Sequence, residues 1–302
     1  LWIETMDRHL PFSFLNHKIK CGNALVGAWF DQFRHYPAMA WKNREGGDKS
    51  HTNGVHFAKN VRTKAIKEFV KNILTPDLAD TVRGQRRYDA AMVKEPEKVH
   101  DQALALLDRL HRLSVVDAEE RARLYRDELL GSPAWQELKA ACDQWCACWF
   151  WPADRLDCAP LPSSFAEPSA ETRALTEELA REKRFFHWEL EFPDVFRREG
   201  SGFDAILGNP PWDIAKPNSK EFFSNLDPLY RSYGKQEALR RQTDYFADQA
   251  IEQDWLDYNA HFRAQSNLLS HAANPWGDPE QGDKPKDRFS LSRGKGNQEM
   301  HG

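Results

Sequence analysis

The residues with the clearest chemical potential stand together near position 210. They are Asn209, Pro210, Pro211 and Trp212, and they directly follow a short apolar stretch at 203–207. Two consecutive prolines impose a rigid, extended turn, because proline continues neither a helix interior nor a central strand. Pro210 also keeps Asn209 out of the α region. The pattern therefore holds an amide side chain, a backbone carbonyl and an aromatic ring in a fixed relation.

These groups suit the transfer of a methyl group to the exocyclic amine of a nucleobase. The N6 amine of adenine is a poor nucleophile, because its lone pair is delocalised into the ring. The side-chain oxygen of Asn209 and the carbonyl of Pro210 can each accept one N–H of that amine. Acceptors aimed at charge that develops on nitrogen favour the transition state. Trp212 offers a ring face on which a base flipped out of duplex DNA can stack.

A parallel strand is expected to position this group. The stretch 203–207 is apolar and lies between Gly202 and Gly208, which is typical of a buried parallel strand. In open α/β sheets, ligands bind beyond the carboxyl ends of the strands. An alternating apolar pattern near the start of the chain predicts a second short strand, which ends at Gly22 and Asn23.

Helical periodicity dominates the chain between these two places. A helix over 60–74 is predicted, because Val61, Ala65, Phe69 and Ile73 recur at four-residue spacing. Its flank carries Lys64, Lys67 and Lys71, a solvated charge run that is also a candidate contact for DNA phosphates. Further helices are predicted over 97–113, 117–131, 132–151, 169–183 and 235–271, from apolar spacing and capping residues. Loop is predicted over 31–58.

Three motifs together resemble a known family. The run 203–212 resembles the catalytic motif of amino-methyltransferases that act on DNA. The segment 186–196 resembles the stretch that precedes this motif in large type IIG restriction–modification methylases, and it is similar to adenine methylases of the BREX and DISARM phage-defence systems. The segment 20–25 is similar to the strand-end motif that lies beside the cofactor's adenine in this family.

The resemblance implies a reaction and a set of site residues. The activity would be site-specific methylation of adenine N6 with S-adenosylmethionine as the cofactor, in restriction–modification or phage defence. Gly22 and Asn23 would bind the cofactor, with Asn23 on its adenine, and the catalytic residues would be Asn209, Pro210, Pro211 and Trp212. The partners would be double-stranded DNA with a flipped adenine, and other defence-system subunits. No metal is expected.

The expected fold is α/β, a partial Rossmann-like sheet of an S-adenosylmethionine-dependent methyltransferase with a large, mostly helical insertion. Residues 1–27 and 185–215 would form parts of this core, residues 28–184 the insertion, and residues 216–302 a helical segment with a loose tail. Since the chain begins within an apolar stretch, we expect it to be an internal fragment that is inactive alone.

Bulk composition narrows the class of protein. The net charge of −4 over 302 residues does not mark a nucleic-acid binder, so DNA contact would need a local basic face. The chain shows neither an apolar run of membrane-spanning length nor a signal peptide. Four cysteines, Cys142, Cys146, Cys148 and Cys158, are expected to be buried structural thiols rather than zinc ligands. The uneven number and clustering of the five cysteines argue against a secreted disulfide framework and favour a cytoplasmic location. Two alternatives remain open: a cytosine-N4 methyltransferase, and a non-catalytic DNA-binding or scaffold subunit of a defence complex.

Overall fold

The computed structural model describes residues 17–42, 44, 51–92, 95–114, 117–196, 202–208 and 216–271. The chain divides into two compact units. The first comprises Leu1–Arg34, Arg86–Ala147 and Ser164–Gly208, and the second comprises His35–Gln85, Cys148–Ser163 and Asn209–Gly302. Each unit therefore combines three stretches that are far apart in the sequence.

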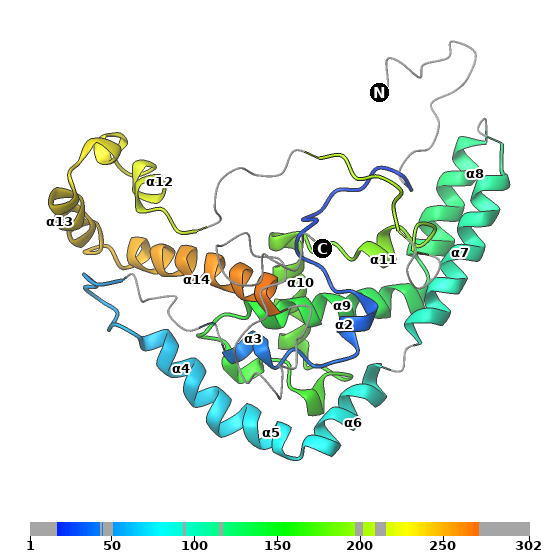
Figure 1. Ribbon diagram of the computed structural model, residues 1–302, viewed down its shortest axis with the longest axis horizontal. Coiled ribbons are helices and arrows are strands. Elements are labelled where there is room, and N and C mark those ends of the chain that lie inside the picture. The colour runs from blue at the N-terminus through cyan, green and yellow to red at the C-terminus, as the bar shows by residue number, and fades with distance from the viewer. Residues whose placement is uncertain are drawn as a thin grey trace, which may run out of the picture. The chain divides into compact units, whose positions relative to one another are not determined.

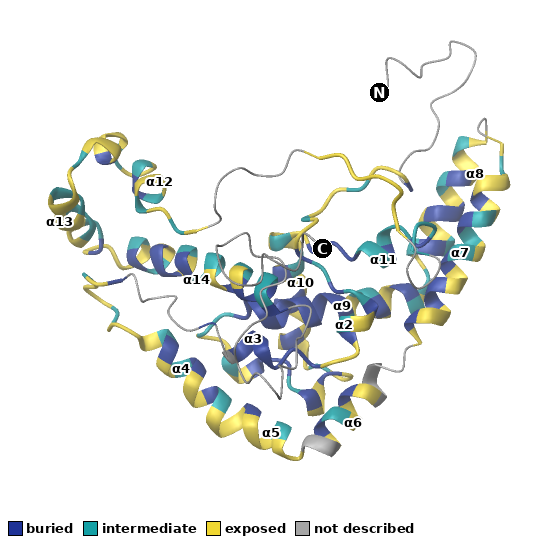
Figure 2. Ribbon diagram, in the orientation of Figure 1, coloured by how far each residue is buried: buried dark blue, intermediate teal, exposed yellow. Residues whose placement is uncertain are grey.

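Helices make up most of the first unit (Figure 1). In chain order they are α2 (Phe30–Phe33), α7 (Pro96–Arg112), α8 (Ala118–Arg123), the π-helical η2 (Leu124–Leu130), α10 (Ala170–Lys183) and α11 (Trp188–Glu191). Helices α6 (Thr81–Met92) and α9 (Pro133–Phe150) belong in part to each unit. Along α7 the residues Val99, Ala103, Leu107 and Leu110 are buried, so one apolar face turns inward (Figure 2).

The second unit is helical as well. Its elements are α3 (Met39–Lys42), α4 (Val61–Phe69), the π-helical η1 (Val70–Leu74), α5 (Thr75–Ala79), the short 3-10 helices η3 (Leu156–Cys158), η4 (Pro162–Ser164) and η5 (Pro228–Ser232), and then α12 (Ser219–Ser224), α13 (Lys235–Tyr245) and α14 (Gln249–His271). Among the described residues, no helix combines the length and the apolar composition that are needed to cross a lipid bilayer.

The prediction of an α/β fold with a partial Rossmann-like methyltransferase sheet is wrong. Over the described ranges the chain forms helices and turns, and its strand-like pairing is limited to one isolated parallel bridge between Asn23 and Phe185. The stretch 203–207 forms no strand, and Ile206 and Leu207 are 82% and 98% exposed. The backbone groups of a parallel strand pair only with neighbouring strands. The described residues provide no such neighbours, so an apolar run does not become a strand.

The helix predicted over 60–74 is present, but the face that it buries is different. Val61 and Ile73, which the spacing placed inward, are 41% and 45% exposed, whereas Ile66, Phe69 and Leu74 are buried. Within α4 the buried face already consists of Thr63, Ile66 and Phe69. At the far end of the helix the cause is η1, because a π-helical turn bonds each residue to the one five positions away. The additional residue in this turn moves Leu74, rather than Ile73, onto the face that Phe69 occupies.

The long helix predicted over 235–271 is two helices. Residues 246–248 separate α13 from α14, and the side chain of Asp248 accepts a hydrogen bond from the backbone N–H of Ala250 at 2.8 Å. Phe246, at this break, belongs to a buried aromatic cluster. Its other members are Phe223, Tyr230 and Trp255.

Four of the five cysteines are buried in and after α9. They are Cys142, Cys146, Cys148 and Cys158, and all are free thiols. Burial raises the pKa of the Cys142 and Cys148 thiols, so these side chains pack as small apolar groups in their thiol form. The prediction that they are buried is confirmed.

Candidate functional site

The segments that the sequence connected with the cofactor and with the approach to the catalytic motif lie side by side in the first unit. Asn23 forms the parallel bridge with Phe185, and its backbone N–H donates to the carbonyl of Arg184 at 2.7 Å. Farther along, the N–H of Phe186 donates to the carbonyl of Val26 at 2.8 Å. Two motifs that are distant in the sequence therefore share one backbone pairing.

His187 holds this pairing from the interior. Its Nδ1 accepts the N–H of Ala28 at 3.0 Å, so its Nε2 carries the proton and donates to Asp143 on α9 at 2.9 Å. The other carboxylate oxygen of Asp143 binds Lys139 Nζ at 2.6 Å. Burial alone would raise the pKa of Asp143, but the hydrogen bond from His187 and the charge of Lys139 hold that pKa below its ordinary value. His187 is 1% exposed, so it positions the backbone rather than touching DNA.

Glycines allow the two segments to approach so closely. A Cβ atom on Gly27 would overlap the carbonyl oxygen of Phe186, and a Cβ atom on Gly22 would meet the Phe186 side chain. The packing against Phe186 is a structural reason for glycine at position 22, and the contact of Gly22 with the cofactor stays a prediction.

The short helix α11 adds contacts of its own. Glu189 accepts the N–H of Phe30, the first residue of α2, at 2.6 Å. Burial raises the pKa of Glu189, and the bond from Phe30 offsets part of that rise. The indole N–H of Trp188 donates to the carbonyl of Ala24 at 3.0 Å. Trp188 thus packs against the segment 20–25, which resembles the family's cofactor motif.

An aromatic cluster holds the start of the stretch that leads to the predicted catalytic residues. The ring of Phe203 lies edge-on to three others. The centroid distances are 5.7 Å to Trp188, 5.6 Å to Phe192 and 5.7 Å to Phe196. From Phe203 the chain continues in exposed positions to Gly208. The anchored end of this stretch therefore belongs to the same structure as the paired segments.

The four predicted catalytic residues lie outside the described residues. They are Asn209, Pro210, Pro211 and Trp212. Their contacts stay a prediction.

Asn23 has the chemistry that a contact to the cofactor's adenine needs. Its side-chain oxygen accepts the N–H of Leu25 at 3.2 Å, which commits that oxygen to its own turn. Its side-chain NH₂ group has no hydrogen-bond partner within the described ranges, and Asn23 is partly exposed. The NH₂ group can therefore donate to a ring nitrogen of adenine.

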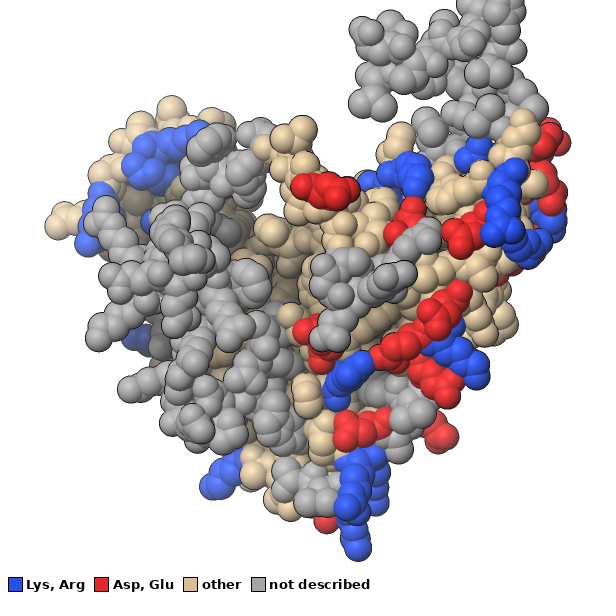
Figure 3. Space-filling view, turned by 45° about the vertical axis from the view of Figure 1, so that its right-hand side comes forward, with Lys and Arg blue, Asp and Glu red and all other residues tan. Residues whose placement is uncertain are grey.

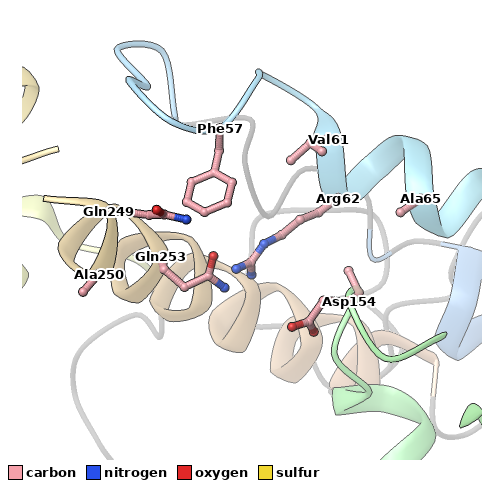
Figure 4. A pocket seen from close by; sticks show the side chains of 9 residues that line it. Phe57, Val61, Arg62, Ala65, Asp154, Gln249, Ala250 and Gln253 are labelled. Atoms are coloured by element: carbon pink, nitrogen blue, oxygen red, sulfur yellow. The ribbon is translucent and has the colours of Figure 1, made fainter. Parts of the chain in front are cut away.

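The second unit contains a pocket of about 840 Å³ that the sequence did not indicate (Figure 4). Three segments line it: Phe57 together with the first turns of α4, the turn after α9, and the first turns of α14. The lining residues are Phe57, Val61, Arg62, Ala65, Ala153, Asp154, Gln249, Ala250 and Gln253. Pockets of roughly 300–1,000 Å³ are typical of small-molecule sites. Arg62, Asp154 and the two glutamines of α14 stand on three separate segments and form no sequence motif, which explains why the sequence analysis missed them.

Glu252 fastens one wall of this pocket to α14. Its buried carboxylate accepts the backbone N–H groups of Val55 at 2.9 Å, His56 at 2.7 Å and Phe57 at 3.4 Å. His51 Nε2 lies 2.6 Å from the same carboxylate, and neither side chain is exposed. Burial would raise the pKa of Glu252, but these hydrogen bonds together bring it below its ordinary value.

Charges of both signs interleave on the face shown in Figure 3, as far as its described residues are concerned. On α4 and η1, Lys64, Lys67 and Lys71 are exposed, and Lys64 lies 3.8 Å from Glu68. Their contact with DNA stays a prediction.

Comparisons with known proteins bear on the middle of the chain. Neither a curated protein nor a solved structure matches it. The family model described as Eco57I restriction-modification methylase does match, over residues 151–255. This range contains the stretch 186–196 and residues 209–212. The match supports a DNA methyltransferase function in restriction–modification, with DNA as the substrate.

Proposed function

We propose that this protein methylates the N6 amine of adenine in double-stranded DNA, as a restriction–modification or phage-defence enzyme of the cytoplasm. One observation carries the proposal. The range that matches the methylase family contains Asn209, Pro210, Pro211 and Trp212, the group whose residue types suit an exocyclic amine.

Each of these residues has a separate task. The side-chain oxygen of Asn209 and the carbonyl of Pro210 accept the two N–H groups of the amine and hold it in place. They also stabilise the positive charge that develops on its nitrogen. Pro211 keeps the turn rigid. Trp212 stacks on the flipped base and offsets part of the unstacking free energy.

The cofactor in this proposal is S-adenosylmethionine, which supplies a methyl group on a positively charged sulfur when bound. Asn23 is the residue that would hold its adenine, through the uncommitted side-chain NH₂. Gly22 allows Phe186 to pack closely behind Asn23. The hydrogen bonds of His187 support the backbone pairing that holds the segment of Asn23 beside Phe186.

Two other functions compete with this one. The N4 amine of cytosine presents the same chemical problem, so the same residues would serve a cytosine-N4 methyltransferase. A scaffold subunit would retain the motif without binding the cofactor. The resemblance of 186–196 to adenine methylases favours adenine.

The test is methylation of DNA by the full-length protein that contains this chain and by its Asn209→Ala variant, with nucleosides identified by mass spectrometry. Asn225→Ala is the matched control, because Asn225 is exposed and its side chain has no partner within the described part of the chain. We expect N6-methyladenine from the protein and the control, and its loss in Asn209→Ala. N4-methylcytosine would overturn the choice of base. Absence of both methylation and cofactor binding would overturn the enzyme and favour the scaffold.

A further inference from the structure

The pocket of the second unit combines one aromatic ring with short side chains. Phe57 projects toward α14 (Figure 4), and three alanines also line the space. They are Ala65, Ala153 and Ala250. A flat group can therefore enter beside Phe57 without displacing long side chains. This shape favours a planar ring, because aromatic rings stack well on flat faces.

Polar side chains in the same pocket have hydrogen-bonding capacity to spare. Gln249 and Gln253 lie one turn apart on α14 and so share a face. Gln249 and Asp154 have no hydrogen-bond or ion-pair partner within the described ranges, while Gln253 Nε2 donates to Asp257 at 3.3 Å. An amide presents a donor and an acceptor together, the pair that matches N7 and the N6 amine of adenine. A carboxylate adds an acceptor for an amine.

The charges of the pocket argue against a phosphate-rich ligand. Arg62 is engaged within the protein, because its guanidinium lies 2.7 Å from the carboxylate of Asp257 and its side chain is only 16% exposed. Since Asp257 already balances the charge of Arg62, the carboxylate of Asp154, which lines the pocket, adds a negative charge that repels a di- or triphosphate. A neutral heterocycle fits this balance.

The pocket is also rigid at its aromatic side. The carboxylate of Glu252 fixes the backbone of residues 55–57, so Phe57 is in place before any ligand arrives. A preordered wall reduces the entropy that binding must offset. The lining residues 153–154 and 249–253 fall within the range that matches a DNA methylase family, for which nucleobases are the relevant ligands.

We propose that this pocket binds an adenine base, stacked on Phe57 and hydrogen-bonded along its edge by Asp154 and the glutamines of α14. The choice of a nucleobase rests on the DNA methylase function, while the pocket shares no residue with the predicted methylation motif. The base is held and not altered, so this is a second base-binding site.

Calorimetric titration of the purified protein with adenosine tests the proposal, with inosine and ADP as comparison ligands. Inosine lacks the exocyclic amine, and ADP adds negative charge. We expect adenosine to bind about tenfold more tightly than inosine, since the loss of a hydrogen bond at a site built for it has roughly this effect. ADP should also bind more weakly than adenosine.

Variants locate the site. Gln249→Ala and Asp154→Asn should each weaken adenosine binding about five- to tenfold. The matched controls, Gln236→Ala and Asp254→Asn, change exposed residues outside the pocket and should leave affinity unchanged. A circular dichroism melt of each variant excludes unfolding as the cause.

Two results would overturn the proposal: no saturable adenosine binding, or binding that falls in Asn23→Ala but not in Gln249→Ala and Asp154→Asn. The second would assign the adenosine to the predicted cofactor contact. Adenosine binding that depends on the pocket, in a protein that methylates no DNA, would keep the pocket and refute the methylation. Methylation without such binding would do the reverse.

Discussion

Each unit of the molecule contains a buried pair of a histidine and a carboxylate, but the two pairs are built in opposite ways. In the first unit His187 is central, since it accepts the N–H of Ala28 and donates to Asp143. In the second unit Glu252 is central, and three backbone N–H groups converge with His51 on one carboxylate. His187 thus links one backbone N–H group to helix α9, whereas the carboxylate of Glu252 accepts hydrogen bonds from three consecutive backbone N–H groups, those of residues 55–57.

The difference follows from the chemistry of the two side chains. A neutral imidazole has one donor and one acceptor, but a carboxylate can accept about four hydrogen bonds. A segment held by a carboxylate therefore depends more on a single residue. The backbone pairing of Asn23 with Phe185 gives the first unit further support that does not involve His187.

The largest effect is expected from Glu252→Ala. The change removes the acceptor of three partly buried backbone N–H groups and of His51, and each buried polar group left unsatisfied costs about 1–3 kcal/mol, so the free energy of unfolding should fall by about 3–5 kcal/mol. Urea denaturation measures this loss. The backbone amides of residues 55–57 should show the largest increase in hydrogen-exchange rate relative to the unchanged protein. Glu178→Ala, at an exposed position on α10, should change stability by less than about 0.5 kcal/mol.

A smaller loss is expected from His187→Ala. The N–H of Ala28 and one oxygen of Asp143 lose their partners, and each unsatisfied buried group costs about 1–3 kcal/mol. Lys139 still compensates the charge of Asp143, so the total should stay near 2–3 kcal/mol. If urea denaturation gave a loss equal to that of Glu252→Ala, the contrast between the two pairs would fail.

Glycines beside the two pairs sharpen the comparison. An added Cβ at Gly27 would overlap the carbonyl oxygen of Phe186, and one at Gly54 would overlap Nε2 of His51 and meet the carbonyl oxygen of Phe57 at 2.7 Å and a carboxylate oxygen of Glu252 at 2.9 Å. Overpacking of this kind costs about 1–3 kcal/mol. We expect the stability loss of Gly27→Ala to lie at the upper end of this range, because the backbone of Phe186, which is hydrogen-bonded to Val26, must shift. Thermal melts of both variants test the order, and a greater loss for Gly54→Ala would reverse it.

The smallest effect is expected from pH. Asp143 and Glu252 both have a pKa below the unfolded-state values of about 3.9 and 4.3. Their contribution to stability is therefore present above those values and is lost as the pH falls through the folded-state pKa values. Urea midpoints between pH 6 and pH 3 should decline less for Glu252→Gln than for the unchanged protein. Parallel curves would assign the acid sensitivity to other groups.

Helix positions could be predicted because they depend on local chemistry. The helix expected over 169–183 appears as α10, and the hydroxyl of Ser169 at its start accepts the N–H of Thr172 at 3.1 Å. The helix expected over 97–113 appears as α7. Asp117 shows the limit of such signals, because α8 begins after it without the side-chain cap that a capping box requires.

Contacts between distant parts of the chain could be predicted less well from the sequence. The apolar run 203–207 gave no information on whether neighbouring strands exist, so the predicted sheet was wrong. The partners of Glu252 and the lining of the pocket are separated by long stretches of chain, and no local pattern connects them. His187 lies in the segment 186–196, whose resemblance the sequence showed, but its role in packing is evident only from its contacts with Ala28 and Asp143.

The π-helical turn η1 determines where this helical run can lose one residue without a change in its buried face. Deleting one residue between Val70 and Leu74 would convert the turn to α-helical geometry, and Phe69 and Leu74 would remain on one face. The same deletion within α4 would rotate everything after it by about 100°, the angle that one residue subtends in an α-helix. The helical run from Val61 to Ala79 therefore has one place, η1, where the loss of one residue keeps the buried side chains on the same face. In the other unit, η2 is a second place of this kind.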